Sequence, residues 1–160
     1  MVAGLDGTVS GDLEAGKVTL DSRHAIIHDL DLLRDELPLE WLQGDIHWLL
    51  QDEHVEVGSA ALTLGNKDLS LRAKFGVDIP VADGAAAINL DLAVETADVG
   101  RVHAYLPAKI MSPEAVAWLD RSLKSGVVTN GRVVINGRFD QIPFDNGEGK
   151  LEVRLPVTNA

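Results

Sequence analysis

Long runs of alternating apolar and polar residues constrain the fold of this chain more than any other feature. Three runs keep a two-residue period, at positions 68–79, 88–95 and 150–158, and a fourth extends from 127 to 139. Such a period is typical of strands with one apolar and one polar face. The folded chain must therefore cover several apolar strand faces.

The run from 127 to 139 follows a well-marked helix. Ser112 suits the N-cap, Pro113 suits the first helical position and Gly126 suits the C-terminal end, so we expect a helix over 113–124. A shorter helix is expected over 99–106, ended by Pro107. On the strand that follows, one predicted face carries Val127, Thr129, Gly131, Val133, Ile135 and Phe139, and the other carries Asn130, Arg132, Asn136 and Arg138.

Earlier candidate strands are shorter and less regular. They cover 4–10, 17–20, 25–33, 43–50, 54–57 and 60–64. Residues typical of turns separate them, and these are Gly16, Gly44, Gly65-Asn66 and Asp83-Gly84. This short spacing favours an antiparallel meander over crossover units.

Helical cover is scarce in comparison with the strands. A helix over 113–124 is about 18 Å long, whereas a sheet of about eight strands is nearly twice as wide. The helix can close one end of the sheet but cannot cover it. The remaining apolar face has three possible fates, which are a sandwich, a closed barrel and a curved open groove.

The composition narrows the classes of function and of partner that the chain can have. The chain is 46% hydrophobic but only 4% aromatic, so the apolar faces are aliphatic and suit either a core or acyl chains. A net charge of −11 argues against nucleic acid and anionic membrane surfaces as partners. No stretch is apolar enough to span a membrane, positions 1–7 do not form a secretion signal, and both termini interrupt strand-like sequence. We expect a segment of a longer protein.

No motif in the sequence indicates catalysis. His24 and His28 are four residues apart, a spacing that suits metal binding in a helix, but they lie in a predicted strand. The acidic stretch 29–36 lacks the pattern of a calcium loop. There is no nucleophile elbow, no phosphate-binding loop and no outstanding carboxylate pair among the 25 acidic residues. We expect no enzyme activity, no metal and no cofactor, and a carbohydrate-active enzyme is the weakest hypothesis.

Several short motifs resemble one family, the AsmA-like superfamily and specifically its large YhdP-type envelope proteins. The motifs are Tyr105-Leu106-Pro107, Met111-Ser112, Trp118-Leu119-Asp120, Gly126, Gly137-Arg138-Phe139, Ile142-Pro143-Phe144 and the segment around Gly149. The resemblance is good from about position 98 to the end and looser at 43–48 and 66–68. It implies a periplasmic bridge of repeating β-grooves, anchored in the inner membrane of Gram-negative bacteria, that moves phospholipid toward the outer membrane and supports its permeability barrier.

With this resemblance, the predicted fold is mainly β, a long curved antiparallel meander that forms an open groove with one or two short helices near 98–125 at one end. Residues 1–160 form a single module, with strands in 1–97, the helical insert in 98–125 and long strands in 126–160. The predicted lipid-contacting residues are Leu69, Leu71, Ile88, Leu90, Leu92, Val133, Ile135, Leu151, Val153 and Leu155.

Expected partners are phospholipid acyl chains, neighbouring segments of the same protein and, through exposed strand edges, other copies. Tyr105, Trp118 and Phe144 are expected to be packing anchors between helix and sheet. The alternative is a structural or protein-binding β-sandwich module with no lipid path.

Overall fold

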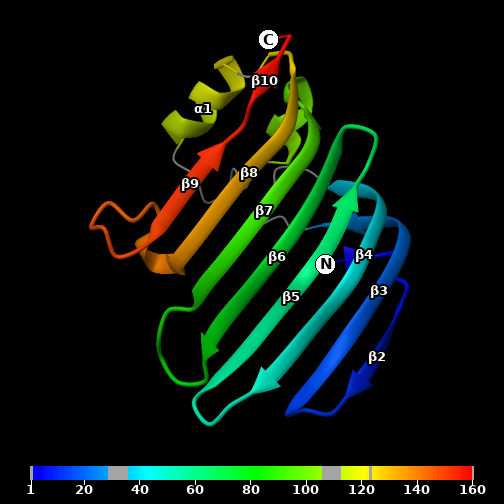
Figure 1. Ribbon diagram of the computed structural model, residues 1–160, viewed down its shortest axis with the longest axis vertical. Helices are drawn as coiled ribbons and strands as arrows, with labels where there is room; N and C mark the ends of the chain where they lie inside the picture. The colour runs from blue at the N-terminus through cyan, green and yellow to red at the C-terminus, as the bar shows by residue number, and fades with distance from the viewer. Residues whose placement is uncertain (1, 29–35, 106–112, 123, 160) are drawn as a thin grey trace.

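The strands form one antiparallel sheet that does not close on itself (Figure 1). The computed structural model describes residues 2–28, 36–105, 113–122 and 124–159. The strands are β1 (Val2–Ala3), β2 (Gly7–Gly11), β3 (Ala15–Ile27), β4 (Leu37–Leu50), β5 (His54–Gly65), β6 (Leu69–Pro80), β7 (Ala87–Asp98), β8 (Val127–Arg138), β9 (Lys150–Arg154) and β10 (Val157–Thr158). The helical elements are the 3₁₀ helices η1 (Val99–Ala104) and η2 (Phe139–Gln141) and the helix α1 (Pro113–Ser122).

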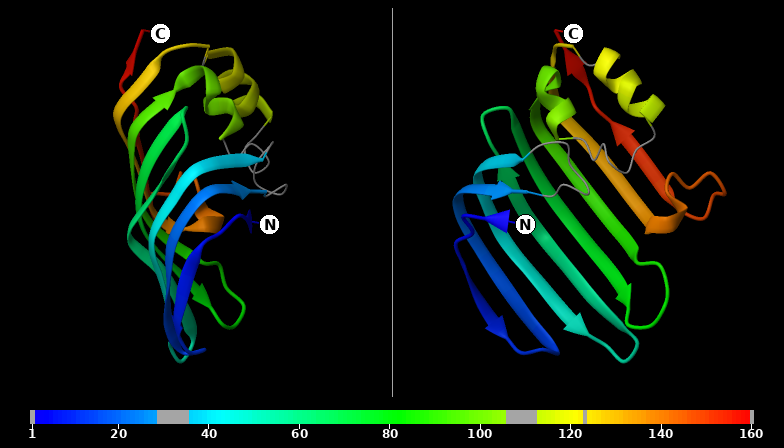
Figure 2. Two further views of the ribbon diagram at one scale, coloured as in Figure 1. Left: turned by 90° about the vertical axis from the view of Figure 1, so that its right-hand side faces the viewer. Right: turned by 180° about the vertical axis from the view of Figure 1, so that it is seen from behind.

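The sheet is a meander in which neighbouring strands follow one another in sequence. β3 to β8 pair in chain order, β1 and β2 pair with β3, and β9 and β10 pair with β8. The first and last strands do not pair with each other. Figure 2 shows that the sheet is curved and that η1 and α1 lie on its concave side. The predicted open, curved meander is therefore confirmed, and neither a sandwich nor a closed barrel forms.

Five strands contain one point at which the two-residue period shifts by a residue. We call the residues of a strand that face its more apolar side the apolar series of that strand, and they are normally two apart. The step is three residues at Ser22 to Ala25 in β3, Leu39 to Leu42 in β4, Ser59 to Leu62 in β5, Val94 to Ala97 in β7 and Val128 to Gly131 in β8. His24 and Asn130 adopt positive φ angles of 61° and 54° at two of these points. Register shifts in the pairing of β4 to β7 mark bulges in β5 and β7, whereas the pairings of β3 with β4 and of β7 with β8 keep their register. All five irregularities keep the apolar series on one side of the sheet.

These shifts explain why several predicted strands were too short. The predicted pair 17–20 and 25–33 belongs to one strand, β3, as far as Ile27, and positions 29–35 lie outside the described residues. The predicted pair 54–57 and 60–64 is the single strand β5. The turns predicted at Gly16 and Gly44 are wrong, because both glycines lie within strands. A Cβ atom at Gly16 would lie 2.1 Å from Trp48 Cζ2, so this glycine makes room for the indole ring.

The C-terminal strands differ from the prediction in two ways. Val128 is 3% exposed and belongs to the core, whereas Val127 is 38% exposed, so the predicted face was wrong before Asn130, which has a positive φ angle, and right after it. The predicted long strand over 150–158 is also wrong. It divides into β9 and β10, because Pro156 has no N–H group to continue the ladder.

The buried core lies at one end of the sheet. One cluster contains Leu69, Val94, Ala97 and Val128 beneath Val99 of η1. The other cluster joins β3 and β4, and it consists of Leu20, Ala25, Leu39 and Leu42. Both predicted helices form, although η1 ends at Ala104 and α1 at Ser122; position 123 and the segment 106–112 lie outside the described residues. The helical segment closes one end of the sheet, as expected from its length.

We predict that Leu39→Ala lowers the free energy of unfolding by about 2–5 kcal/mol, because Leu39 is 2% exposed and its loss leaves a cavity. The matched control is Val153→Ala, which removes apolar atoms from a side chain that is 57% exposed and costs less than about 1 kcal/mol. Urea titration followed by circular dichroism measures both values. Equal effects of the two substitutions would contradict this location of the core.

Candidate functional site

Strand register places the predicted lipid-contacting residues on one side of the sheet. Residues directly opposite each other in neighbouring strands share a face. One row therefore runs across four strands through Phe75, Leu90, Ile135 and Leu151. A second row runs through Ala73, Leu92, Val133 and Val153. We call this side the apolar face; from β3 to β9 it also carries Val18, Leu20, Ile46, Trp48, Val55, Val57, Leu62, Leu64, Leu71, Val77, Ile79, Ile88 and Val94.

The apolar face is the concave side of the sheet. Val99 and Tyr105, which belong to or follow η1, pack against Leu69 and Leu71 of this face. Since the helical elements lie on the concave side, the apolar residues line the inside of the curve (Figure 2). The chain itself therefore covers Leu69, which is 6% exposed and belongs to the core as well as to the predicted site.

Away from this covered end, the apolar face is open. Leu90, Leu92, Val133 and Ile135 are half-buried, although they lie in the middle of long strands. Exposure increases toward the β9 edge, where Leu151 is 42% exposed. Leu155 lies between β9 and β10, and its Cδ2 atom would be 2.7 Å from a Cβ at Gly131, so it also lies over this face. Aliphatic side chains of this size are usually buried, and the described residues provide no second layer over them.

The opposite side, which we call the polar face, carries charged and amide side chains. An ion pair joins Arg132 to Asp91, with 2.6 Å between Nη2 and Oδ2. Ion pairs of 3.4 Å also join Lys17 to Asp45 and Arg72 to Glu95. Arg132 lowers the pKa of Asp91, mainly through its hydrogen bonds and further through its positive charge. Exposed pairs of this kind contribute little stability but keep this face in water.

The described hollows lie on the polar face. The larger has a volume of about 640 Å³ and is lined by side chains such as His47, Lys74 and Asp78, with Gly76 between them. A smaller hollow, about 560 Å³, lies beside Trp41 and Arg23. Among the described residues no group of three or more histidine, aspartate or glutamate side chains could hold a metal ion.

Two family-like residues, Tyr105 and Phe144, anchor segments to the sheet. Tyr105 is half-buried, and its hydroxyl group donates a hydrogen bond of 3.3 Å to Asp68 and also contacts Asn66. Burial is the main cause that raises its pKa. Phe144 is buried and lies over Gly137 and Gly149; a Cβ at Gly149 would be 2.2 Å from the phenyl ring. Both glycines are therefore needed for the ring to reach the sheet.

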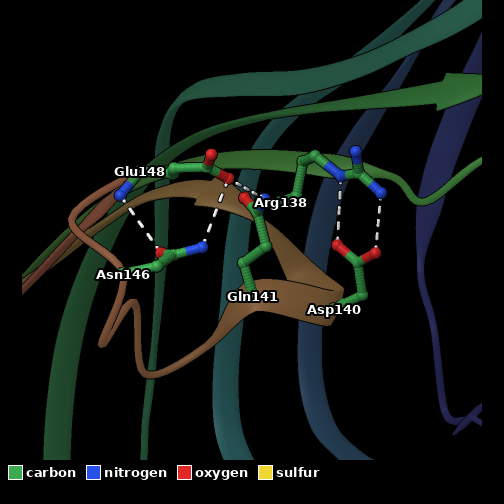
Figure 3. A network of polar contacts seen from close by, with 5 residues as sticks. All are labelled: Arg138, Asp140, Gln141, Asn146 and Glu148. Carbon is green, nitrogen blue, oxygen red and sulfur yellow. Dashed lines mark hydrogen bonds and ion pairs between the residues drawn. The ribbon is translucent and has the colours of Figure 1, made fainter.

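The loop that carries Phe144 is tied together by polar contacts (Figure 3). Arg138 pairs with Asp140 at 2.7 Å, and Gln141 donates a hydrogen bond to Glu148. Asn146 donates to the same carboxylate at 3.3 Å. These contacts hold the connection between β8 and β9 in place.

The remaining family-like residues are placed only in part. The Gly126 carbonyl accepts a hydrogen bond of 2.9 Å from the Val99 N–H group, which joins η1 to the start of β8. Pro143 follows a cis peptide bond, and Asp120 is a half-buried residue of α1. Trp118 and Leu119 also belong to α1, but their side chains are outside the described part, as are Leu106 and Pro107 altogether.

Sequence reasoning missed part of the apolar face. Val18, Leu62 and Leu64 belong to it, but the irregular point in β3 and the bulge in β5 hid their periodicity. These residues could have been found by a search for alternating apolar residues that allows one step of three residues within a strand. Among the described residues no helix is long and apolar enough to cross a membrane.

The fold defines a class of mainly β protein with one open, curved antiparallel sheet that has an apolar and a charged face (Figure 2). The family described as "YhdP protein" matches residues 1–160, and the chain belongs to this family. No solved structure matches the chain.

A curated relative from Escherichia coli (strain K12) carries the name "Intermembrane phospholipid transporter YhdP". The two sequences are 25% identical over 154 residues, which is 96% of this chain. The chain spans only 12% of the length of that relative.

We predict that Arg132→Gln raises the pKa of Asp91 toward its ordinary value of 3.8, because the main hydrogen-bond donor to the carboxylate is lost. A depressed carboxyl pKa adds stability above the unfolded-state pKa, and this stability is lost as the pH falls through the folded-state value. Any contribution of the pair is therefore fully present above about pH 4 and is lost progressively as the pH falls below that value. Carboxyl NMR titration measures the midpoint. Arg72→Gln, which affects Glu95, is the control and should leave the Asp91 midpoint unchanged.

Proposed function

We propose that the apolar face is a stretch of path along which phospholipid acyl chains move. The observation that carries this proposal is the set of continuous apolar rows that cross the strands, over which the described part of the chain provides no second layer. Leu71, Leu90, Leu92, Val133 and Ile135 form its middle, and Leu151, Val153 and Leu155 form its side toward β9. Ile88 completes the row that includes Val77. Leu69 lies at the end of the apolar face that η1 covers, so it supports the fold there and does not form part of the open surface.

Transfer energetics support movement along such a face. Each methylene that leaves water gains about 0.8 kcal/mol, whichever aliphatic side chain it contacts. A row of similar leucine, isoleucine and valine side chains therefore offers nearly equal affinity at successive positions. An acyl chain can slide along the row without a deep local trap, and specificity for one lipid species is low.

The name of the E. coli relative, intermembrane phospholipid transporter, supports this proposal. We infer that this chain is one segment of a similar transporter, located in the periplasm, with the whole protein anchored in the inner membrane. Neighbouring segments would extend the apolar face on either side. The role is conduction and not catalysis, since transfer of a lipid along a surface requires no covalent step.

We predict that a photocrosslinking amino acid at Leu90 captures phospholipid when the chain is produced in bacteria, whereas the same group at Asn89 does not. The two positions are adjacent in β7, but Leu90 lies on the apolar face and Asn89 on the polar face. Mass spectrometry of the crosslinked protein identifies the adduct. Equal capture at both positions, or none at Leu90, would favour the alternative of a structural module without a lipid path.

We also predict that Leu90→Arg leaves the fold intact but reduces the phospholipid that copurifies with the chain. The half-exposed guanidinium group can reach water from an open face. The contrasting variant is Val94→Arg, in which a charge enters a cluster where Val94 is 6% exposed, and this variant should unfold the chain. Circular dichroism and native mass spectrometry report fold and bound lipid. Unfolding by Leu90→Arg would show that the face is sealed.

A further inference from the structure

The apolar face can hold acyl chains but not the charged headgroup of a phospholipid. From β3 to β9 none of the strand residues on this face is charged. Transfer of a phosphate group from water to such a surface is strongly unfavourable. The headgroup of a bound phospholipid must therefore lie at a rim of the face, in contact with water. This step rests on the proposed function, in which acyl chains occupy the face.

The exposure of the strand residues shows which end of the face is open. In β6, Leu69 is 6% exposed near η1, whereas Ile79, on the same face near the other end of the strand, is 43% exposed. The change is the same in β4, from Leu39 at 2% to Leu50 at 41%. The open part of the apolar face therefore leads away from η1, toward the opposite ends of the strands.

Four connections lie at this open end, because alternate connections of an antiparallel meander lie on the same side of the sheet (Figure 1). They span 12–14, 51–53, 81–86 and 139–149, and we call them the hairpin rim. Backbone hydrogen bonds tie the first three to neighbouring strands or connections. The Leu50 N–H group donates to the Glu14 carbonyl at 2.6 Å, and the Val81 N–H group donates to the Glu53 carbonyl at 2.9 Å.

The hairpin rim contains acidic residues but no lysine or arginine. Its acidic residues are Asp12, Glu14, Asp52, Glu53, Asp83, Asp140, Asp145 and Glu148. Each of the three connections that join neighbouring strands at the opposite end, 28–36, 66–68 and 99–126, contains at least one lysine or arginine. The two ends of the sheet therefore differ in charge, and the open end is the one without basic residues.

The basic residues on the adjoining ends of the strands do not offset this charge on the apolar side. They lie on the polar face, and each pairs with a carboxylate. The pairs are Lys17 with Asp45 at 3.4 Å, Arg138 with Asp140 at 2.7 Å and Lys150 with Glu152 at 2.8 Å. Asp140 is the only member of the hairpin rim among these partners, so the rim keeps a negative charge.

We propose that the hairpin rim selects phospholipids by headgroup. It favours a headgroup with an ammonium group, as in phosphatidylethanolamine, over one with net negative charge, as in phosphatidylglycerol. The ammonium group attracts the rim carboxylates and offsets their repulsion of the phosphate, whereas a glycerol headgroup carries no positive charge. Exposed charges interact over about one Debye length, about 8 Å at physiological ionic strength. The bias is therefore modest, and it acts on the headgroup while the apolar rows accept acyl chains in general.

The test measures the headgroup composition of the lipid that the unmodified chain takes up. The chain is incubated at low ionic strength with vesicles that contain equal amounts of phosphatidylethanolamine and phosphatidylglycerol with identical acyl chains. It is then separated from the vesicles and analysed by native mass spectrometry. We expect about a threefold excess of bound phosphatidylethanolamine. At high ionic strength the excess should fall toward equal amounts, because the rim charges are then screened.

A charge-reversed variant tests whether the rim causes this preference. Asp52→Lys combined with Glu53→Lys places two positive charges between β4 and β5, and the excess of phosphatidylethanolamine should disappear or reverse. The matched control, Asp21→Lys combined with Glu95→Lys, makes the same change in net charge on the polar face of β3 and β7 and should keep the preference. All four residues are exposed, so both variants should fold, and circular dichroism verifies this.

Equal amounts of the two lipids on the unmodified chain at low ionic strength, or an excess of phosphatidylglycerol, would overturn this proposal and leave the lipid path in place. The same loss of preference in the control variant would also overturn it, because the net charge of the chain would then be the cause. Absence of bound phospholipid here together with no crosslink at Leu90 would overturn the proposed function, and headgroup selection with it.

Discussion

The structure depends on an imbalance between apolar strand surface and the material available to cover it. Ten strands form one layer, and among the described residues only a few helical turns lie over it. Burial is therefore concentrated at one end, where Val99 and Tyr105 cover β6 to β8. Elsewhere the backbone ladder holds the sheet together while the aliphatic side chains stay half-exposed. The open face follows directly from this imbalance.

Much of the fold could be predicted from the sequence because its signal is local. Alternation in β6 and β7 is uninterrupted over Leu71 to Val77 and Ile88 to Val94, and these strands were predicted within a few residues. The same rule failed in β3, β5 and β8, where a backbone irregularity, a bulge in the case of β5, moves the apolar series by one position. A bulge depends on how a partner strand pairs, as at Ser59 and Leu62, and this information is not local.

The candidate site was predictable in its chemistry but not in its shape. Leu90, Ile135 and Leu151 were assigned to one face from their spacing, and register places them in one row. The sequence alternation does not encode the curvature of the sheet, which makes that face concave. Nor does it encode the position of η1, which covers Leu69. Phe144 illustrates the same limit, because its burial needs Gly137 and Gly149 to come together from both sides of a loop.

A single-layer sheet also has directional mechanical properties. Its ladder hydrogen bonds run perpendicular to the strands. Tension applied along the strands is shared by many bonds at once, whereas tension across them pulls neighbouring strands apart in sequence, beginning at short strands such as β9 and β2. The molecule is therefore strong under shear and weak under peeling. A long assembly of such sheets would yield first at the joints between its units and would keep each unit folded.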